Sequence, residues 1–141
     1  MPFVLDASVA LAWCFEDEAT AGTDAVLEQL AEDSAVAPPL WELEVINVLL
    51  LAERRGRITE SQTARFVALL TQLPILIDSA GVDMASVLAA GRHHGQSAYG
   101  AAYLVLAERE GIPLATIDGK LRVAAQAAGV PVLGGGSGRG Q

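Results

Sequence analysis

The sequence predicts an α/β fold, a three-layer α/β/α sandwich in which a parallel central sheet lies between two layers of helices. Three observations predict it. Short apolar runs recur along the chain, longer segments of helical periodicity separate them, and the 141 residues are 52% hydrophobic, enough for one buried core. Strands that alternate with helices form parallel sheets, because each helix carries the chain back across the sheet.

Each expected strand is a run of three or four mostly apolar residues. Such runs are too short for helices and suit a sheet that is covered on both faces. The first is Phe3-Val4-Leu5, which ends at Asp6. The other four are residues 35–37, 75–77, 113–116 and 130–133.

Longer helices are expected between these strands. Pro38-Pro39 precede residues 40–55, whose apolar side chains repeat at helical spacing. Thr59 and Gln62 form a capping box for a helix that ends at about residue 70. A short helix follows the first strand, and the remaining helices are residues 84–90, 98–110 and 121–128, the last two ending before Gly111 and Gly129.

Composition excludes several classes of protein. Cys14 is the single cysteine, so the chain has neither an internal disulfide nor a thiolate metal cluster. No run reaches the roughly 18 apolar residues of a membrane helix, and the amino terminus lacks the basic start of a signal peptide. We therefore expect a soluble cytoplasmic protein with one domain, residues 1–133, and a disordered glycine-rich tail, residues 134–141.

The formal charge of −8 is unevenly distributed. Residues 1–60 hold twelve acidic and three basic side chains, whereas residues 61–141 hold five acidic and six basic ones. Taken as a whole, an acidic chain repels nucleic acid, because phosphate binding depends on Lys and Arg. Acidic side chains gathered in a pocket, however, attract a divalent cation, and the cation reverses the local sign of the charge.

Three acidic residues are candidates for such a pocket. Asp6 follows the first expected strand and Asp118 the fourth, at the edge where parallel sheets bind ligands. Either one alone also suits a turn or a helix cap, but two at one edge favour a shared site. Glu44, which alone also suits a solvated helix acid, shares a helix face with Asn47, three residues on.

The chemistry of these side chains indicates the ion. They are hard oxygen ligands with no Cys or His cluster beside them, which favours Mg²⁺ or Mn²⁺ over zinc. Carboxylate-bound Mg²⁺ serves phosphoryl chemistry. Ser8, Asn47 and Thr116 lie two or three residues from the acids and are expected to orient ligands or waters around the ion.

Four segments carry a resemblance to a known family. They are Val4-Leu5-Asp6-Ala7-Ser8-Val9, residues 39–49, Ser97-Ala98-Tyr99-Gly100-Ala101-Ala102-Tyr103 and Ala115-Thr116-Ile117-Asp118-Gly119-Lys120-Leu121. In order and spacing they resemble a PIN domain of the VapC toxin type over residues 2–133. The resemblance implies an α/β/α sandwich and an endoribonuclease that uses Mg²⁺ or Mn²⁺ and a metal-activated water, leaving 5′-phosphate and 3′-hydroxyl ends. It also implies that Asp6, Glu44 and Asp118 are the catalytic metal ligands.

Gly100 departs from the family pattern, which has an aspartate between the tyrosine and the alanine pair. With Ser97 as the expected cap, Gly100 falls in the first turn of a helix, where glycine costs up to about 1 kcal/mol relative to alanine. One explanation is a packing glycine that permits close backbone approach. We favour the loss of an acidic metal ligand at this position, natural or deliberate, which predicts a folded chain with weak or no activity.

The resemblance further implies partners. They are a cognate VapB-type antitoxin and a second copy of the chain, in a homodimer that brings two acidic sites near one face. A basic antitoxin segment would pair with the carboxylates there. Contacts to the RNA backbone would come from the few basic side chains, with these candidates: Arg54, Arg55, Arg57, Arg92, Lys120 and Arg122.

The aromatic residues near the acids allow two interpretations. Trp13, Cys14, Phe15 and Trp41 suit core packing, which we favour. The alternative is that they line an exposed groove for an amphipathic antitoxin helix.

Two other functions also stay open. Gly100 suits a non-catalytic PIN-fold module that binds or sequesters an antitoxin. A phosphoacceptor receiver domain built on Asp6 is less well supported, because Lys120, the only lysine, lies two residues from Asp118 instead of on a later loop of its own.

Overall fold

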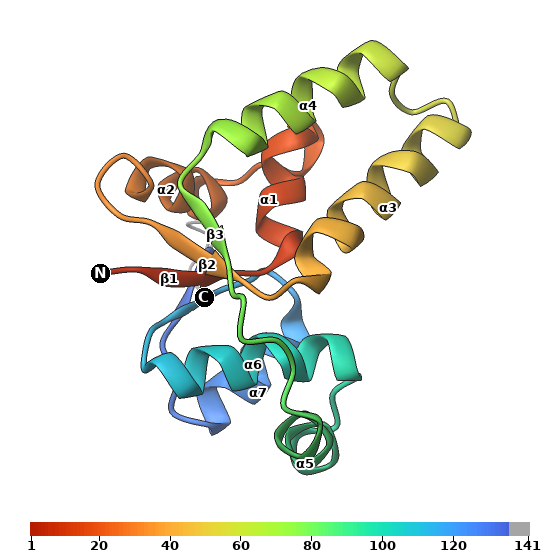
Figure 1. Cartoon of the computed structure of the whole chain (residues 1–141). Helices are drawn as coiled ribbons and strands as arrows, with labels where there is room; N and C mark the ends of the chain where they lie inside the picture. The colour runs from red at the N-terminus through yellow and green to blue at the C-terminus, as the bar shows by residue number, and fades with distance from the viewer. Residues whose placement is uncertain (136–141) are drawn as a thin grey trace.

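Five short parallel strands form the centre of the molecule (Figure 1). The structure is a computed structural model and describes residues 1–135. The strands lie in the order β3-β2-β1-β4-β5, and every neighbouring pair is parallel. Their bounds are β1 Phe3–Leu5, β2 Ala35–Ala37, β3 Ile75–Ile77, β4 Leu114–Ala115 and β5 Val132–Leu133.

Helices cover both faces of this sheet. In Figure 1, α1 to α4 lie above the sheet, while α6 and α7 lie below it with α5 packed outside α6. The predicted three-layer α/β/α sandwich is therefore confirmed. The helices are α1 Ala7–Cys14, α2 Ala21–Gln29, α3 Leu40–Arg54, α4 Glu60–Gln72, α5 Met84–His94, α6 Ala98–Glu110 and α7 Gly119–Ala127, with a 3-10 turn η1 at Glu16–Glu18.

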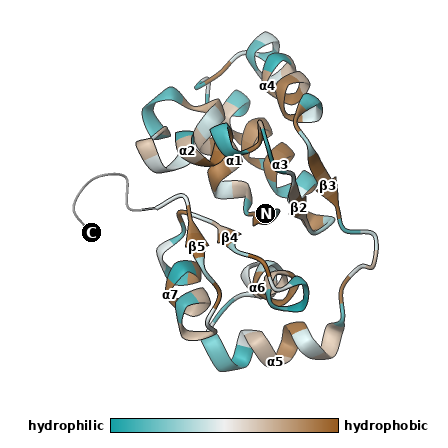
Figure 2. Ribbon diagram, turned by 90° about the vertical axis from the view of Figure 1, so that its left-hand side faces the viewer, coloured by the Kyte–Doolittle hydropathy of each residue, from teal (hydrophilic) through white to brown (hydrophobic). Residues whose placement is uncertain are grey.

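The core is built around β1. Phe3, Val4 and Leu5 are fully buried, as are Leu104 of α6 and Leu114 of β4. Figure 2 shows hydrophobic residues on the strands and along α1. Because the sheet is covered on both faces, Asp6, which follows β1, lies in an apolar environment.

The aromatic residues of the amino-terminal half belong to the core. Cys14, Phe15 and Trp41 are buried, and Trp13 is half-buried with its Nε1 donating to the Thr23 carbonyl at 2.8 Å. The core interpretation of these side chains is confirmed.

Two helices differ from the sequence prediction. α2 was not predicted, because its start is a box of Thr20 and Thr23 in which threonine replaces the usual Glu or Gln. α5 extends past residue 90 to His94, because Gly91 is accommodated within the helix and Gly95, with φ of 64°, ends it.

Smaller differences concern the carboxy-terminal elements. α7 begins two residues earlier than predicted, because Asp118 caps it. β4 and β5 have two residues each and are shorter than the predicted runs 113–116 and 130–133. Of the expected tail 134–141, residues 136–141 lie outside the described part of the chain. Over residues 1–135, no helix combines the length and apolar character needed to cross a membrane.

Candidate active site

The candidate site residues lie where the parallel strands end. Asp6 follows β1 and is the residue before α1, Asp118 is the residue before α7, and Glu44 lies in the second turn of α3. α6 runs back from this edge toward the start of β4, so its first turn, with Gly100, also lies there. We call the region of Asp6, Glu44, Gly100 and Asp118 the carboxyl edge. In Figure 1 it lies on the right, between the starts of α3 and α6.

Asp6 is a buried carboxylate with two hydroxyl partners. Its side chain is 7% exposed. The Oδ2 atom accepts hydrogen bonds from Ser8 Oγ at 2.6 Å and from Thr116 Oγ1 at 2.8 Å. No side-chain hydrogen bond caps α1 within the described residues, and the carboxylate accepts from the Ser8 hydroxyl in the first turn of that helix. Its Oδ1 atom has no partner among residues 1–135 and remains available to a ligand.

Backbone donors fix the direction of these hydroxyl protons. Ser8 Oγ accepts from the Ile117 amide at 3.2 Å, and Thr116 Oγ1 accepts from the Asp118 amide at 3.1 Å. Each hydroxyl therefore has its own proton free to donate to Asp6. The result is a carboxylate held in one orientation by residues of α1 and of the loop after β4.

Glu44 is held by a residue that sequence reasoning did not identify. The Tyr103 hydroxyl donates to Glu44 Oε1 at 2.5 Å, linking α6 to α3. Tyr103 is 1% exposed, so on sequence grounds it resembles an ordinary core aromatic. The spacing could have indicated this role, because Tyr103 lies three residues after Gly100 and therefore on the same face of α6.

The three carboxylates influence one another through Asp6. Burial raises the pKa of Asp6, its hydroxyl partners lower it, and the charge of Asp118 raises it further. Burial also raises the pKa of Glu44, against the Tyr103 hydrogen bond, and the charge of Asp6 adds to the rise. A bound cation would relieve both the burial penalty and the repulsion.

Asp118 serves as a helix cap and as a neighbouring charge. Its Oδ1 accepts from the amides of Lys120 at 2.9 Å and Leu121 at 3.2 Å. Its Oδ2 has no partner within the described residues. Asp118 can therefore cap α7 through Oδ1, as the sequence suggested, and bind a ligand through Oδ2.

Nothing in the backbone requires glycine at position 100. Gly100 does not have a positive φ, and its amide donates to Ser97 Oγ at 3.3 Å in an ordinary helix start. The three atoms nearest to a Cβ built there all belong to the Gln96 side chain. Because no backbone of another element approaches as closely, the packing-glycine explanation is not supported.

The family follows from comparison with known proteins. The family model described as PIN domain matches residues 3–127. This chain belongs to the PIN domain family. The fold of this PIN domain is also similar to the crystal structure of PAE2754 from Pyrobaculum aerophilum, with a TM-score of 0.69 and 23% identity over 94% of this chain and 83% of that one. No match of comparable significance is found among curated proteins.

PIN domains are generally metal-dependent nucleases, and a divalent cation such as Mg²⁺ requires hard oxygen donors. Within residues 1–135, no three Asp, Glu, His or Cys side chains converge closely enough to form a metal-binding cluster. The individual donors nevertheless fit a hard cation, because Asp6 Oδ1 and Asp118 Oδ2 are unpartnered carboxylate oxygens at one edge. Mg²⁺ retains several waters and needs only one or two protein carboxylates.

Two of the six RNA-binding candidates already have partners in this PIN domain. Arg57 pairs with Asp17 at 2.9 Å and Glu18 at 3.0 Å, and its guanidinium lies 4.2 Å from the Phe15 ring centroid. Arg122 donates to the carbonyls of Thr116 and Leu133 and so holds α7 against the ends of β4 and β5. Both side chains therefore make interactions within the fold.

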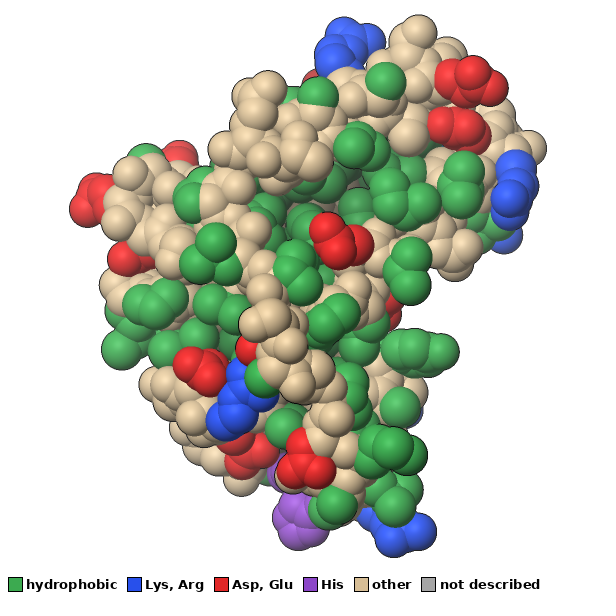
Figure 3. Space-filling view, viewed as in Figure 1, with side chains coloured by type: hydrophobic (Ala, Val, Ile, Leu, Met, Phe, Trp, Pro, Cys, Tyr) green, Lys and Arg blue, Asp and Glu red, His purple; other side chains and the backbone are tan. Residues whose placement is uncertain are grey.

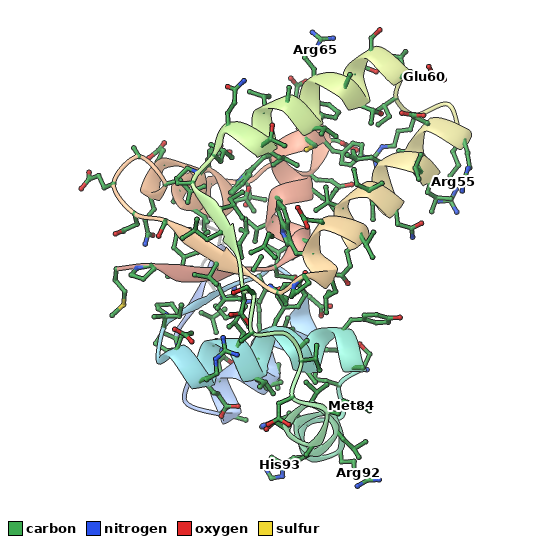
Figure 4. The ribbon with its side chains drawn as sticks, viewed as in Figure 1. Arg55, Glu60, Arg65, Met84, Arg92 and His93 are labelled. Atoms are coloured by element: carbon green, nitrogen blue, oxygen red, sulfur yellow. The ribbon has the colours of Figure 1, made fainter. Side chains whose placement is uncertain are left out.

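The other four candidates are exposed but scattered. Figure 4 places Arg55 at the far end of α3 and Arg92 on α5, at the opposite end of the molecule, and Arg54 adjoins Arg55. Lys120 adjoins the carboxyl edge, two residues after Asp118. Asn47, expected to orient ligands, is exposed and lines a hollow with Glu44 and Tyr99.

Tyr103→Phe is expected to lower the free energy of unfolding by about 1 kcal/mol, because it removes the hydrogen bond to a partly buried carboxylate. Urea denaturation in EDTA measures the free energy of unfolding of each variant. The matched control is Tyr99→Phe, on the same helix, because the Tyr99 side chain is 62% exposed. Equal stabilities of the two variants would show that the Tyr103 hydroxyl does not hold Glu44.

The raised pKa of Asp6 predicts a pH-dependent stability in the metal-free protein. The folded state keeps the Asp6 proton to higher pH than the unfolded state does, so the contribution of Asp6 to stability falls as pH rises from the usual Asp value of about 3.9 through the raised folded pKa. Asp6→Asn removes this loss and is expected to be about 1 kcal/mol more stable than the unsubstituted chain at pH 7. Unfolding at pH 4 and pH 7 in EDTA measures the difference, which should grow with pH; a constant difference would contradict it.

Proposed function

We propose that this PIN domain is the toxin component of a toxin–antitoxin pair. It is an Mg²⁺- or Mn²⁺-dependent endoribonuclease whose activity is impaired because Gly100 stands where the family has an acidic ligand. The observation that carries the proposal is the carboxyl edge, where Asp6, Glu44 and Asp118 lie beside a glycine that the backbone does not require.

The residues have distinct roles in this proposal. Asp6 Oδ1 would hold the cation directly, and Asp118 Oδ2 and the free oxygen of Glu44 would hold it directly or through water. The cation supplies charge neutralisation and water activation at the scissile phosphate. Ser8 and Thr116 keep Asp6 oriented, and Tyr103 does the same for Glu44. Glu44 or Asp118 is suited to accept a proton from the attacking water, since each keeps one oxygen free.

Surface features support protein partners for this function. Hydrophobic side chains gather around a hollow between α3 and α4 in Figure 3, lined by residues that include Ile46, Val67 and Leu73. Such a hollow suits an apolar antitoxin segment, and the acidic edge suits a basic one. Leu43 and Tyr99, 73% and 62% exposed beside Glu44, support a homodimer contact near the site. We place the activity in the cytoplasm, with its RNA substrate.

The ends of the RNA products test the proposed reaction. Hydrolysis by an activated water leaves 5′-phosphate and 3′-hydroxyl ends, so fragments made by the Gly100→Asp variant should ligate to an adapter without prior phosphorylation. EDTA should abolish the fragments. Products with 5′-hydroxyl and 2′,3′-cyclic phosphate ends would contradict the proposal, because they arise from attack by the RNA's own 2′-hydroxyl.

A non-catalytic PIN module that binds or sequesters an antitoxin is the second candidate. Gly100 and the lack of a converged acidic cluster over residues 1–135 favour it. The two functions differ in metal binding. A Mn²⁺ titration in which Gly100→Asp restores no binding, combined with retained binding of the cognate antitoxin on coexpression, would favour the non-catalytic module.

A further inference from the structure

Gln96 lies directly over Gly100. Its backbone is fixed in the short link between α5 and α6, where the Gln96 amide donates to the Gly91 carbonyl at 3.0 Å. Its half-buried side chain crosses to the start of α7, and Nε2 donates to the Lys120 carbonyl at 3.1 Å. Gln96 therefore joins the first turn of α6 to the loop that carries Asp118.

The hydrogen bond to Lys120 also sets the orientation of the Gln96 amide. A carbonyl oxygen only accepts, so the NH₂ group must face Lys120 and the amide oxygen must face the other way. That oxygen is turned toward Gly100, where it lies 2.5 Å from the position of a Cβ. The contact involves the end of a flexible side chain, and the Gln96 Cδ is 3.6 Å from the same point.

This 2.5 Å distance is close to the distance between the Cβ of an aspartate and its own carboxylate oxygens. Standard C–C and C=O bond lengths place the oxygens of an aspartate about 2.4 Å from its own Cβ. The Gln96 oxygen is therefore as far from the Cβ position at residue 100 as an aspartate's own oxygen would be. Any side chain at position 100 would therefore have to displace the end of Gln96.

We propose that the Gln96 amide oxygen replaces the missing carboxylate as an oxygen donor to the cation at the carboxyl edge. Gln96 and Gly100 thus form a coupled pair, in which a neutral ligand from the link before α6 takes the place of a charged ligand from α6 itself. The inference rests on the proposed metal site. It predicts a chain that retains weak cation binding.

The chemistry of the replacement determines its effect. An amide oxygen is a hard donor that Mg²⁺ and Mn²⁺ accept, so the coordination site is retained. It carries no formal charge, so cation affinity falls below that of a site with an aspartate. In a Gly100→Asp variant the new side chain displaces Gln96, which is free to rotate, and the role of Gln96 is lost.

Mn²⁺ titration of four proteins tests the coupling: the unsubstituted chain, Gln96→Leu, Gly100→Asp and the double variant. Calorimetry is the readout, with Asp6→Asn as the blank. Gln96→Leu is expected to weaken Mn²⁺ binding about tenfold in the unsubstituted chain and by less than about twofold in the Gly100→Asp chain. Gln126→Leu, an exposed glutamine on α7, is the matched control and should leave Mn²⁺ affinity unchanged.

Several outcomes would overturn the inference. They are an equal loss in both backgrounds, no loss in either, or no Mn²⁺ binding by any of the four proteins. Urea denaturation of each variant in EDTA establishes that the fold is intact. RNA cleavage is measured separately. A Gly100→Asp variant that binds Mn²⁺ but cleaves no RNA refutes the proposed function. A Gly100→Asp variant that cleaves RNA, combined with no effect of Gln96→Leu on Mn²⁺ affinity, refutes only the role of Gln96.

Discussion

Gly100→Asp is expected to raise Mg²⁺-dependent RNA cleavage on the order of 100-fold over the unsubstituted chain. The substitution adds a carboxylate to the first turn of α6, one turn before Tyr103 and facing the edge that holds Asp6 and Glu44. The backbone accepts it, because φ is not positive and the nearest atoms to the new Cβ belong to the Gln96 side chain, whose amide can move. The added negative charge strengthens attraction for the cation.

The assay compares initial rates on a single-stranded RNA in Mg²⁺ and in Mn²⁺, with EDTA added to parallel samples. Gly100→Asn is the matched control, because it has the same shape without the charge. Gly100→Asn should recover only a small part of the increase in cleavage rate. Equal rates for all three proteins would show that position 100 is not a vacated ligand position.

Asp6→Asn, made in the Gly100→Asp background, is expected to lower cleavage on the order of 1000-fold. Asp6 is the carboxylate that interacts with both of the others, through the charge of Asp118 on Asp6 and of Asp6 on Glu44. Asparagine retains an oxygen that accepts from Ser8 and Thr116, so the orientation of the side chain is preserved while the charge is lost. The same substitution stabilises the metal-free fold, which separates a loss of function from a loss of structure.

The same initial-rate assay measures this loss. Glu42→Gln is the control, because Glu42 is an exposed acid on the same helix as Glu44. Its rate should stay within about twofold of the Gly100→Asp parent. If Asp6→Asn retained more than a tenth of the parental rate, Asp6 would not be a metal ligand.

Much of the fold could be predicted, because local signals and tertiary demands agree. The run 3–5 is apolar throughout, and the structure buries it on both faces. Thr59 and Gln62 form the predicted capping box, and Gly111 ends α6 in the left-handed conformation. Where such a signal was weak, as at the Thr20–Thr23 box, the helix was missed.

The candidate site could be predicted only in part. Asp6, Glu44 and Asp118 stand out because charged residues follow or interrupt apolar segments. Tyr103 and Gln96 carry no such signal, because a buried tyrosine in an apolar helix and a glutamine in a loop are both ordinary. Their roles depend on which element each side chain reaches, and this is set by packing between helices that are distant in sequence.

The interactions that basic side chains make within the fold could not be predicted, for a related reason. Arg57 and Arg122 resemble free surface charges in the sequence, but one pairs with η1 and the other binds backbone carbonyls. The overall charge of −8 was also a poor guide, because Asp6 is buried and Glu44 is half-buried, and the charges of Asp6, Glu44 and Asp118 interact. Their effect on a phosphate depends on the cation between them.

An anomalous difference map from crystals of the Gly100→Asp variant soaked in Mn²⁺ would locate the cation. We expect a peak at the carboxyl edge, about 2.1 Å from Asp6 Oδ1 and from an oxygen of the new side chain at position 100. Crystals of the unsubstituted chain should show a weaker peak at the same place. No peak there in either crystal, or a peak only at another site such as His93 and His94 on α5, would contradict the claim that Asp6 and position 100 belong to one metal site.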